Sequence, residues 1–289
     1  MSNFWFALLG VAGLSAMGLA APAEAADTPP LISVSDPVPR HGEITYLELL
    51  QQAIPDLVAD GVGGTAHGHH TRPVRELAGG QDGDQPPDPV EVTYVEAQRI
   101  KAAGKDRILV LASLGQAQDS VASFSVLALF DDGPHPKLLD MVDVGMYRDT
   151  SFSEQAKLSL GPGENAVVTY SEHSNSSQTY GIWLVAYVRH DKLALAAQVF
   201  GLSDRECGWQ RMETPTFTGR PVRGRALGNI DIVVREQSTR DRDAQCDSPP
   251  SAPYLRTWRA TYRWDSAKED FVTDSTALDR LAKRNEARF

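Results

Sequence analysis

The sequence predicts an all-β protein with a short helix near its N-terminus and another at its C-terminus. Two observations support this prediction. From about residue 90 to residue 274, apolar and polar residues alternate with a period of two, which is typical of β-strands. A unit made of an apolar strand, a polar loop and an aromatic-bearing strand also occurs three times in this stretch. Internal repetition of this size indicates a stacked or radial β architecture.

The three copies read along residues 107–132, residues 165–191, and residues 229–238 with 253–265. A further strand precedes each copy, so we expect three related four-strand units at about residues 90–144, 151–202 and 215–274. Consecutive antiparallel strands form meanders, which are propeller-like or belong to a sandwich. Because three units are too few to close a known propeller, a partial propeller, a sandwich and a barrel all remain open.

Residues 1–25 have the features of a secretory signal peptide. Residues 4–20 are almost entirely apolar or small, and Ala23-Glu24-Ala25 offers a cleavage site. We therefore predict a periplasmic or secreted protein with no stable membrane span after cleavage. The alternative is an uncleaved anchor, although about 17 residues is short for a span of about 20.

Residues 26–89 precede the β domain of residues 90–289 and are expected to hold one helix and a polar loop. Thr45 and Glu48 have the spacing of a capping box, and Pro55 ends the helical pattern. One helix face carries Leu47, Leu50, Ile54 and Leu57.

The chain ends in a predicted amphipathic helix. Asp274 or Ser275 is the expected cap, and Leu278 and Leu281 with Ala282 make an apolar stripe. Such a stripe predicts packing over a sheet.

The formal net charge is −10, and removal of residues 1–25, whose one charged side chain is Glu24, leaves −10 + 1 = −9. This acidity argues against a general nucleic-acid binder, which needs Lys and Arg for the phosphates. Basic residues do gather within residues 205–263, a distribution that can steer an anionic partner.

The sequence has two cysteines, Cys207 and Cys246. An exported protein with a small, even number of cysteines is expected to hold them in a disulfide. Neither lies in a motif typical of a catalytic thiol.

Three histidines, His67, His69 and His70, form the one candidate metal site of the sequence. Imidazole is a common ligand of Zn and Cu, and Asp60, Asp82 or Asp84 are possible carboxylate partners. No zinc-type spacing accompanies them, so we predict a solvated loop and no cofactor, with Zn or Cu as the alternative.

Polar segments that follow the first strand of each copy are candidates for a binding rim. Two of these segments share a Glu-x-Ser motif, at residues 172–174 and 236–238. Rims of β scaffolds often carry binding groups, although turn chemistry selects the same residue types. The candidate ligand-binding residues are Glu172, His173, Asn175, Glu236 and Gln237.

The sequence contains no nucleophile elbow, phosphate loop or dinucleotide motif. We therefore predict a non-catalytic module that binds a protein, peptide or glycan. The first alternative is a periplasmic metal-binding protein or metal-dependent hydrolase that uses the three histidines. The second is a structural subunit that pairs sheet edges with another copy. The sequence indicates no oligomeric state.

Overall fold

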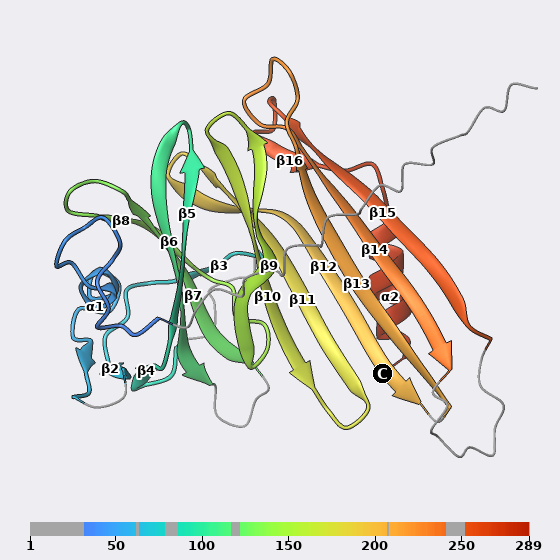
Figure 1. Cartoon of the computed structure of the whole chain (residues 1–289), viewed down its shortest axis with the longest axis horizontal. Coiled ribbons are helices and arrows are strands. Elements are labelled where there is room, and N and C mark those ends of the chain that lie inside the picture. Colours follow the sequence, from blue (N-terminus) through green and yellow to red (C-terminus); the bar gives the residue numbers. More distant parts are fainter. Residues whose placement is uncertain are drawn as a thin grey trace, which may run out of the picture.

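A computed structural model describes residues 32–61, 64–78, 86–116, 122–206, 208–240 and 252–288. The described chain is mostly β, with strands in three sheets and two short helices, α1 (Tyr46–Leu50) and α2 (Ala277–Glu286) (Figure 1). The predicted all-β fold with a helix near each end is confirmed. The predicted signal peptide and both cysteines lie outside the described residues.

A five-stranded sheet has the strand order β3-β8-β7-β6-β5. All its neighbours are antiparallel except β3 and β8, which pair in parallel. The strands are β3 (Arg75–Glu76), β5 (Val95–Ala102), β6 (Lys105–Gln116), β7 (Ser123–Asp131) and β8 (Leu138–Asp143).

An eight-stranded antiparallel sheet follows in the order β16-β15-β14-β13-β12-β11-β10-β9, so neighbouring strands are also consecutive in the sequence. Its strands are β9 (Asp149–Gly161), β10 (Glu164–Ser174), β11 (Gln178–Arg189), β12 (Lys192–Glu206), β13 (Trp209–Arg220), β14 (Asn229–Arg240), β15 (Tyr254–Asp265) and β16 (Asp270–Val272).

The N-terminal segment contains α1 and a small sheet of the order β1-β2-β4. These strands are β1 (Val58–Ala59), β2 (Ala66–Gly68) and β4 (Val90–Val92). Thr45 caps α1 as predicted: its hydroxyl accepts from Glu48 N, and Glu48 Oε2 accepts from Thr45 N at 2.7 Å. The helix is shorter than its apolar pattern, and turns carry Ile54 and Leu57 into the core.

The five-stranded sheet is buried on both faces, which explains its nearly continuous apolar strands. One face, with Val110 and Phe130, packs against the N-terminal segment. The other face, with Leu109 and Leu127, packs against Leu184 and its neighbours on β9–β12. The two larger sheets are thus stacked face to face, in the manner of a sandwich.

The second face of β9–β12 belongs to a separate core, because the eight-stranded sheet curls over it. Val185 and Val199 from that face meet Ile232 from β14 and Leu278 and Leu281 from α2. Helix α2 contacts β12 and β15 and lies beside the far end of the sheet (Figure 1). The expected packing of the C-terminal helix over a sheet is therefore observed.

Three consecutive four-strand meanders are present, namely β5–β8, β9–β12 and β13–β16. The propeller-like alternative is not confirmed, because the second and third meanders hydrogen-bond through β12 and β13 in one sheet instead of forming separate blades.

The cap of α2 differs from the predicted residues. Thr276 occupies the N-cap position without a side-chain cap bond, and Ser275 Oγ accepts from Ala277 N at 3.2 Å. In the described part of the chain, no helix is long and apolar enough to cross a membrane.

Candidate functional site

Strands β12 and β13 pair only beside their connecting turn and then separate. Their register covers Asp204 to Glu206 against Trp209 to Arg211. Beyond it, Glu213 Oε2 accepts from Leu202 N at 3.0 Å, and Ser203 Oγ accepts from Glu213 N at 3.4 Å. In this region, backbone N–H groups of the two strands bond side-chain oxygens and not backbone carbonyls. Strand β13 therefore diverges from β12.

The far end of β13 instead lies against β9. A Cβ atom on Gly219 would stand 2.3 Å from the backbone oxygen of Ser159, so a glycine is needed there. Leu160 O also accepts from Gly228 N at 2.7 Å. Strands β9–β13 therefore curl into a partly closed barrel.

A cavity of about 520 Å³ lies inside this curled sheet. Part of its wall is an irregular stretch of β9, where the register with β10 jumps from Lys157↔Val167 to Phe152↔Thr169. The lining residues are mainly hydroxyl-bearing, amide or aromatic: Ser151, Phe152, Ser153, Gln155, Tyr170, Thr179, Trp183, Ser203, Thr214, Thr216 and Phe217.

A stacked aromatic pair lies on one wall of the cavity. The rings of Tyr170 and Trp183 have centroids 4.5 Å apart and an interplanar angle of 24°. They rest on two glycines that face each other across β11 and β12, Gly181 and Gly201. A Cβ atom on either glycine would stand 2.8 Å from the indole ring. The missing side chains therefore make room for the flat stack.

The β13 edge that faces the cavity is closed to strand addition. Ser203 Oγ accepts from Glu213 N, Pro215 has no N–H group, and Gln155 Oε1 accepts from Phe217 N at 3.2 Å. Because a proline or a side-chain acceptor occupies these successive positions, an added peptide strand finds few free donors.

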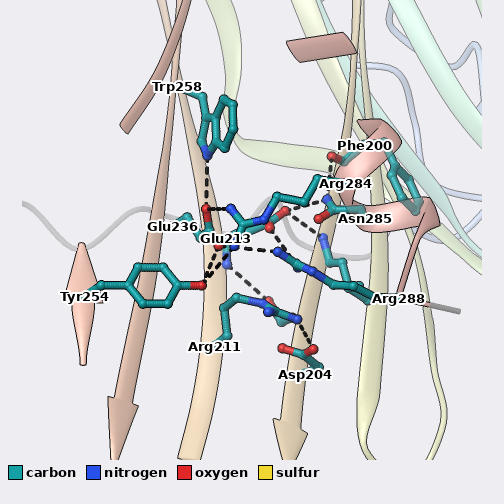
Figure 2. Close-up of polar contacts among 12 residues, drawn as sticks. Phe200, Asp204, Arg211, Glu213, Glu236, Tyr254, Trp258, Arg284, Asn285 and Arg288 are labelled. Carbon is teal, nitrogen blue, oxygen red and sulfur yellow. Dashed lines mark hydrogen bonds and ion pairs between the residues drawn. The ribbon is translucent and has the colours of Figure 1, made fainter. Parts of the chain in front are cut away.

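Figure 2 shows a buried charged cluster. The cluster shares Glu213 with the lining of the cavity. Glu213 and Glu236 are paired across β13 and β14, and the side chains of both are fully buried. Arg288, two residues after the end of α2, lies 3.4 Å from each carboxylate. Arg284 bonds Glu236 at 2.5 Å, and Asn285 bonds Glu213 at 2.7 Å.

The cluster also includes two aromatic donors to Glu236 and a second buried ion pair. Glu236 also accepts from Tyr254 Oη at 2.6 Å and from Trp258 Nε1 at 3.1 Å. Beside them, Arg211 pairs with Asp204, and both side chains are buried. Every base of the cluster thus faces an acid, and α2 is tied to the sheet.

The two glutamates respond oppositely to this environment. Burial raises the pKa of Glu213, and its hydrogen bonds from Leu202 N and Asn285 offset this only in part. Burial also acts to raise the pKa of Glu236, but hydrogen bonds from Tyr254, Arg284 and Trp258 outweigh it and lower the pKa. The two pKa values shift in opposite directions because Glu236 accepts from more strong hydrogen-bond donors than Glu213 does.

Three of the residues proposed for the rim lie together at one end of β10. Glu172 Oε2 accepts from Tyr170 Oη at 2.7 Å, and the ring of His173 stacks on Tyr180. Asn175 is in the turn, where its Oδ1 accepts from the backbone N–H groups of Ser177 and Gln178. Turn formation therefore occupies the Asn175 carboxamide oxygen.

Glu236 and Gln237 lie apart from Glu172, His173 and Asn175, and their two side chains point to opposite faces of the sheet. They lie within strand β14, not in the loop that the polar segment suggested. Glu236 points into the charged cluster, whereas Gln237 is exposed on the opposite face. The polar residues of this strand resemble a loop in the sequence, because the arginines that pair with Glu236 lie far along the chain, Arg284 on α2 and Arg288 just after it.

The three histidines of the candidate metal site each pair with a different carboxylate. His67 bonds Asp60 at 2.8 Å, His69 bonds Asp88 at 2.7 Å, and His70 bonds Asp56 at 2.7 Å. Among the residues that the structure describes, no three potential ligands converge on a point. Asp82 and Asp84 lie outside those residues.

Sequence reasoning missed the cavity and its aromatic stack. The Tyr170–Trp183 pairing depends on the register of β10 and β11, and the facing glycines depend on the register of β11 and β12. Two glycines inside otherwise apolar strands were the available signal, since such glycines mark close approach of another group.

Comparison of the chain with models of protein families, with curated proteins and with solved structures found no match.

Proposed function

We propose that this is an exported, non-catalytic binding protein that holds a glycan in the cavity between β9 and β13. The observation that carries the proposal is the Tyr170–Trp183 stack beside walls of hydroxyl and amide side chains. An aromatic ring packs against the apolar face of a sugar, while hydroxyl and amide groups both donate to and accept from sugar hydroxyls. The volume of about 520 Å³ is within the usual range of small-ligand sites.

Two features favour a glycan over an extended peptide. The β13 edge is blocked by Ser203, Pro215 and Gln155, so peptide binding by strand addition finds few free backbone donors. The cavity instead offers side-chain groups: Ser151, Ser153 and Thr216 have no side-chain hydrogen bond to any described residue.

The arrangement of the acidic residues in the cavity supports binding of a glycan without its hydrolysis. Hydrolysis of a glycosidic bond requires two carboxyl groups that flank it. The acidic lining residues are Glu154 and Glu213. Glu213 is fully buried, and its oxygens bond Leu202 N, Asn285 and Arg288. This carboxylate is committed to the attachment of α2.

The test is binding of the purified protein to a panel of neutral and acidic oligosaccharides, followed by titration calorimetry. Trp183→Ala removes the stacked ring, and we expect it to weaken binding at least tenfold, equivalent to about 1.4 kcal/mol. Ser153→Tyr fills the cavity from its wall and is expected to abolish binding without removing the ring.

Ser266→Tyr, an equivalent change in the exposed β15–β16 turn, is the control and should bind like the wild type. Circular dichroism establishes that each variant is folded. Absence of binding to every oligosaccharide at millimolar concentration, or full binding by both cavity variants, would refute the proposal.

A further inference from the structure

The outward face of β13–β15 is an open sheet surface that is mostly polar, with the exposed Met212 and Leu255 in one row at its end. Along β13 the buried and exposed residues alternate, so Thr214, Thr216 and Thr218 are exposed while Glu213 and Phe217 point inward. The register continues this face across β14 and β15. Three of its cross-strand rows are Thr214–Arg235–Thr257, Thr216–Val233–Arg259 and Arg220–Asn229–Arg263.

The two central arginines of this face have no acidic partner among the residues that the structure describes. Arg235 and Arg259 make no ion pair with any described residue, and both are exposed. They are diagonal neighbours on adjacent strands, because Arg235 lies opposite Thr257. Such neighbours have Cβ atoms about 7 Å apart. Two like charges at this spacing favour an anion that binds both guanidinium groups.

The acidic residues of the same face do not neutralise the central pair. The outward acids on the described parts of β13–β15 are Asp231 and Asp265. Asp231 already bonds Arg220 at 2.9 Å, and Asp265 lies 4.0 Å from Lys268. The remaining excess of positive charge is notable in a chain of net charge −10.

The arginine pair is continuous with the cavity. Thr214 and Thr216 line the cavity, and they are also the immediate neighbours of Arg235 and Val233 on the outward face. A polymer that leaves the cavity over the edge of β13 therefore meets threonine hydroxyls and then two guanidinium groups that pair with no described acid.

The residue types on the outward face favour an acidic saccharide over a nucleic acid. The outward positions of β13–β15, all within the described strands, carry no aromatic side chain. Proteins that bind single-stranded nucleic acid use aromatic rings on which bases stack. Hydroxyl and guanidinium groups instead suit the hydroxyl, carboxylate and sulfate groups of an acidic saccharide.

We infer that the glycan is an anionic polysaccharide: one sugar occupies the cavity, and the chain continues over Thr214 and Thr216 to place carboxylate or sulfate groups on Arg235 and Arg259. This inference rests on the proposed function, because it takes the cavity as the sugar site.

The experiment compares matched neutral and acidic saccharides, namely dextran with dextran sulfate and galacto-oligosaccharide with oligogalacturonate. We expect the acidic member of a pair to bind at least tenfold more tightly. Arg235→Gln/Arg259→Gln should remove that preference and leave binding of the neutral member unchanged. The salt dependence of log K should become shallower by about one for each cation removed. Arg72→Gln/Lys105→Gln, an equal charge change at exposed positions away from this face, is the control.

The outcomes separate the two proposals. Loss of neutral binding in Trp183→Ala, with no effect of the arginine changes on acidic binding, would overturn the inference and leave the proposed function standing. Loss of acidic binding in the arginine variant, with no effect of Trp183→Ala, would refute the continuous path and the cavity as sugar site. Tighter arginine-dependent binding to phosphatidylglycerol vesicles or to single-stranded DNA than to any acidic saccharide would also overturn the inference.

Discussion

At the scale of single residues, Glu213 and Glu236 show how donors decide the state of a buried acid. The two carboxylates face each other on β13 and β14, and like charges in that position repel. Glu236 receives bonds from Tyr254, Trp258 and Arg284, and its pKa is lowered. Glu213 has fewer strong donors, and burial raises its pKa. Glu236 is thus the stabilising anion of the pair.

Replacement of each glutamate by glutamine separates these roles. We expect Glu236→Gln to lower the free energy of unfolding at pH 7 by about 3 kcal/mol, because it leaves the partly buried Arg284 without its anion. Glu213→Gln should cost less, since a neutral group there relieves the penalty of a buried charge. Urea denaturation measures both values. A larger loss for Glu213→Gln would contradict this assignment.

The lowered pKa of Glu236 also predicts how the stability of the fold depends on pH. A lowered folded-state pKa means that Glu236 stabilises the fold above its unfolded value of about 4.5, and that this contribution is lost as pH falls through the folded pKa. The stability difference between wild type and Glu236→Gln should therefore shrink below pH 4.5. A difference that stays constant down to pH 2 would contradict the ion-pair explanation.

At the scale of secondary-structure elements, α2 depends on two different attachments. Leu278 and Leu281 are buried in the core inside the curled eight-stranded sheet, while Arg284 and Asn285 of α2, with Arg288 just after it, join the charged cluster. A helix of 10 residues is marginal by itself in water. Its sheet contacts therefore determine whether it forms.

Removing the core attachment should weaken the whole fold. Leu281 is 0% exposed, so we expect Leu281→Ala to lower the free energy of unfolding by about 3 kcal/mol through lost burial and a cavity. Lys283→Ala on the exposed side of α2 is the control and should change it by less than about 0.5 kcal/mol. Chemical denaturation provides the comparison. Equal effects of the two changes would show that α2 is not packed as described.

At the scale of the whole molecule, the two large sheets share one core. Leu109 and Leu127 from the five-stranded sheet meet Val167, Leu184 and Ala186 from the eight-stranded sheet. Neither sheet can lose this contact without exposing the apolar surface of the other. The described sheets are thus expected to unfold as one cooperative unit.

Four of the five tryptophans offer a direct measurement of this coupling, because Trp183, Trp209, Trp258 and Trp264 lie in the eight-stranded sheet. The fifth, Trp5, belongs to the predicted signal peptide. Leu127→Ala, on β7 of the other sheet, should shift the midpoint of urea unfolding followed by tryptophan fluorescence. The same shift should occur in far-ultraviolet circular dichroism. Lys105→Ala, exposed on β6, serves as the control. A fluorescence transition that Leu127→Ala leaves unmoved would mean that the sheets unfold independently.

The sequence by itself determined the type and rough position of most elements. Period-two alternation revealed the three meanders, Thr45 and Glu48 marked the start of α1, and Leu278 and Leu281 revealed the apolar side of α2. These signals are local, because one strand or helix turn carries the whole pattern.

Only the tertiary structure decided which meanders share a sheet and where a ligand site forms. Glu236 reads as part of a polar loop until Arg284, 48 residues later, is placed beside it. Tyr170 and Trp183 are ordinary core aromatics until strand register stacks them over Gly181 and Gly201. Long-range pairing brings these residues together, and a sequence pattern that repeats every two residues contains no information about which distant strand lies opposite.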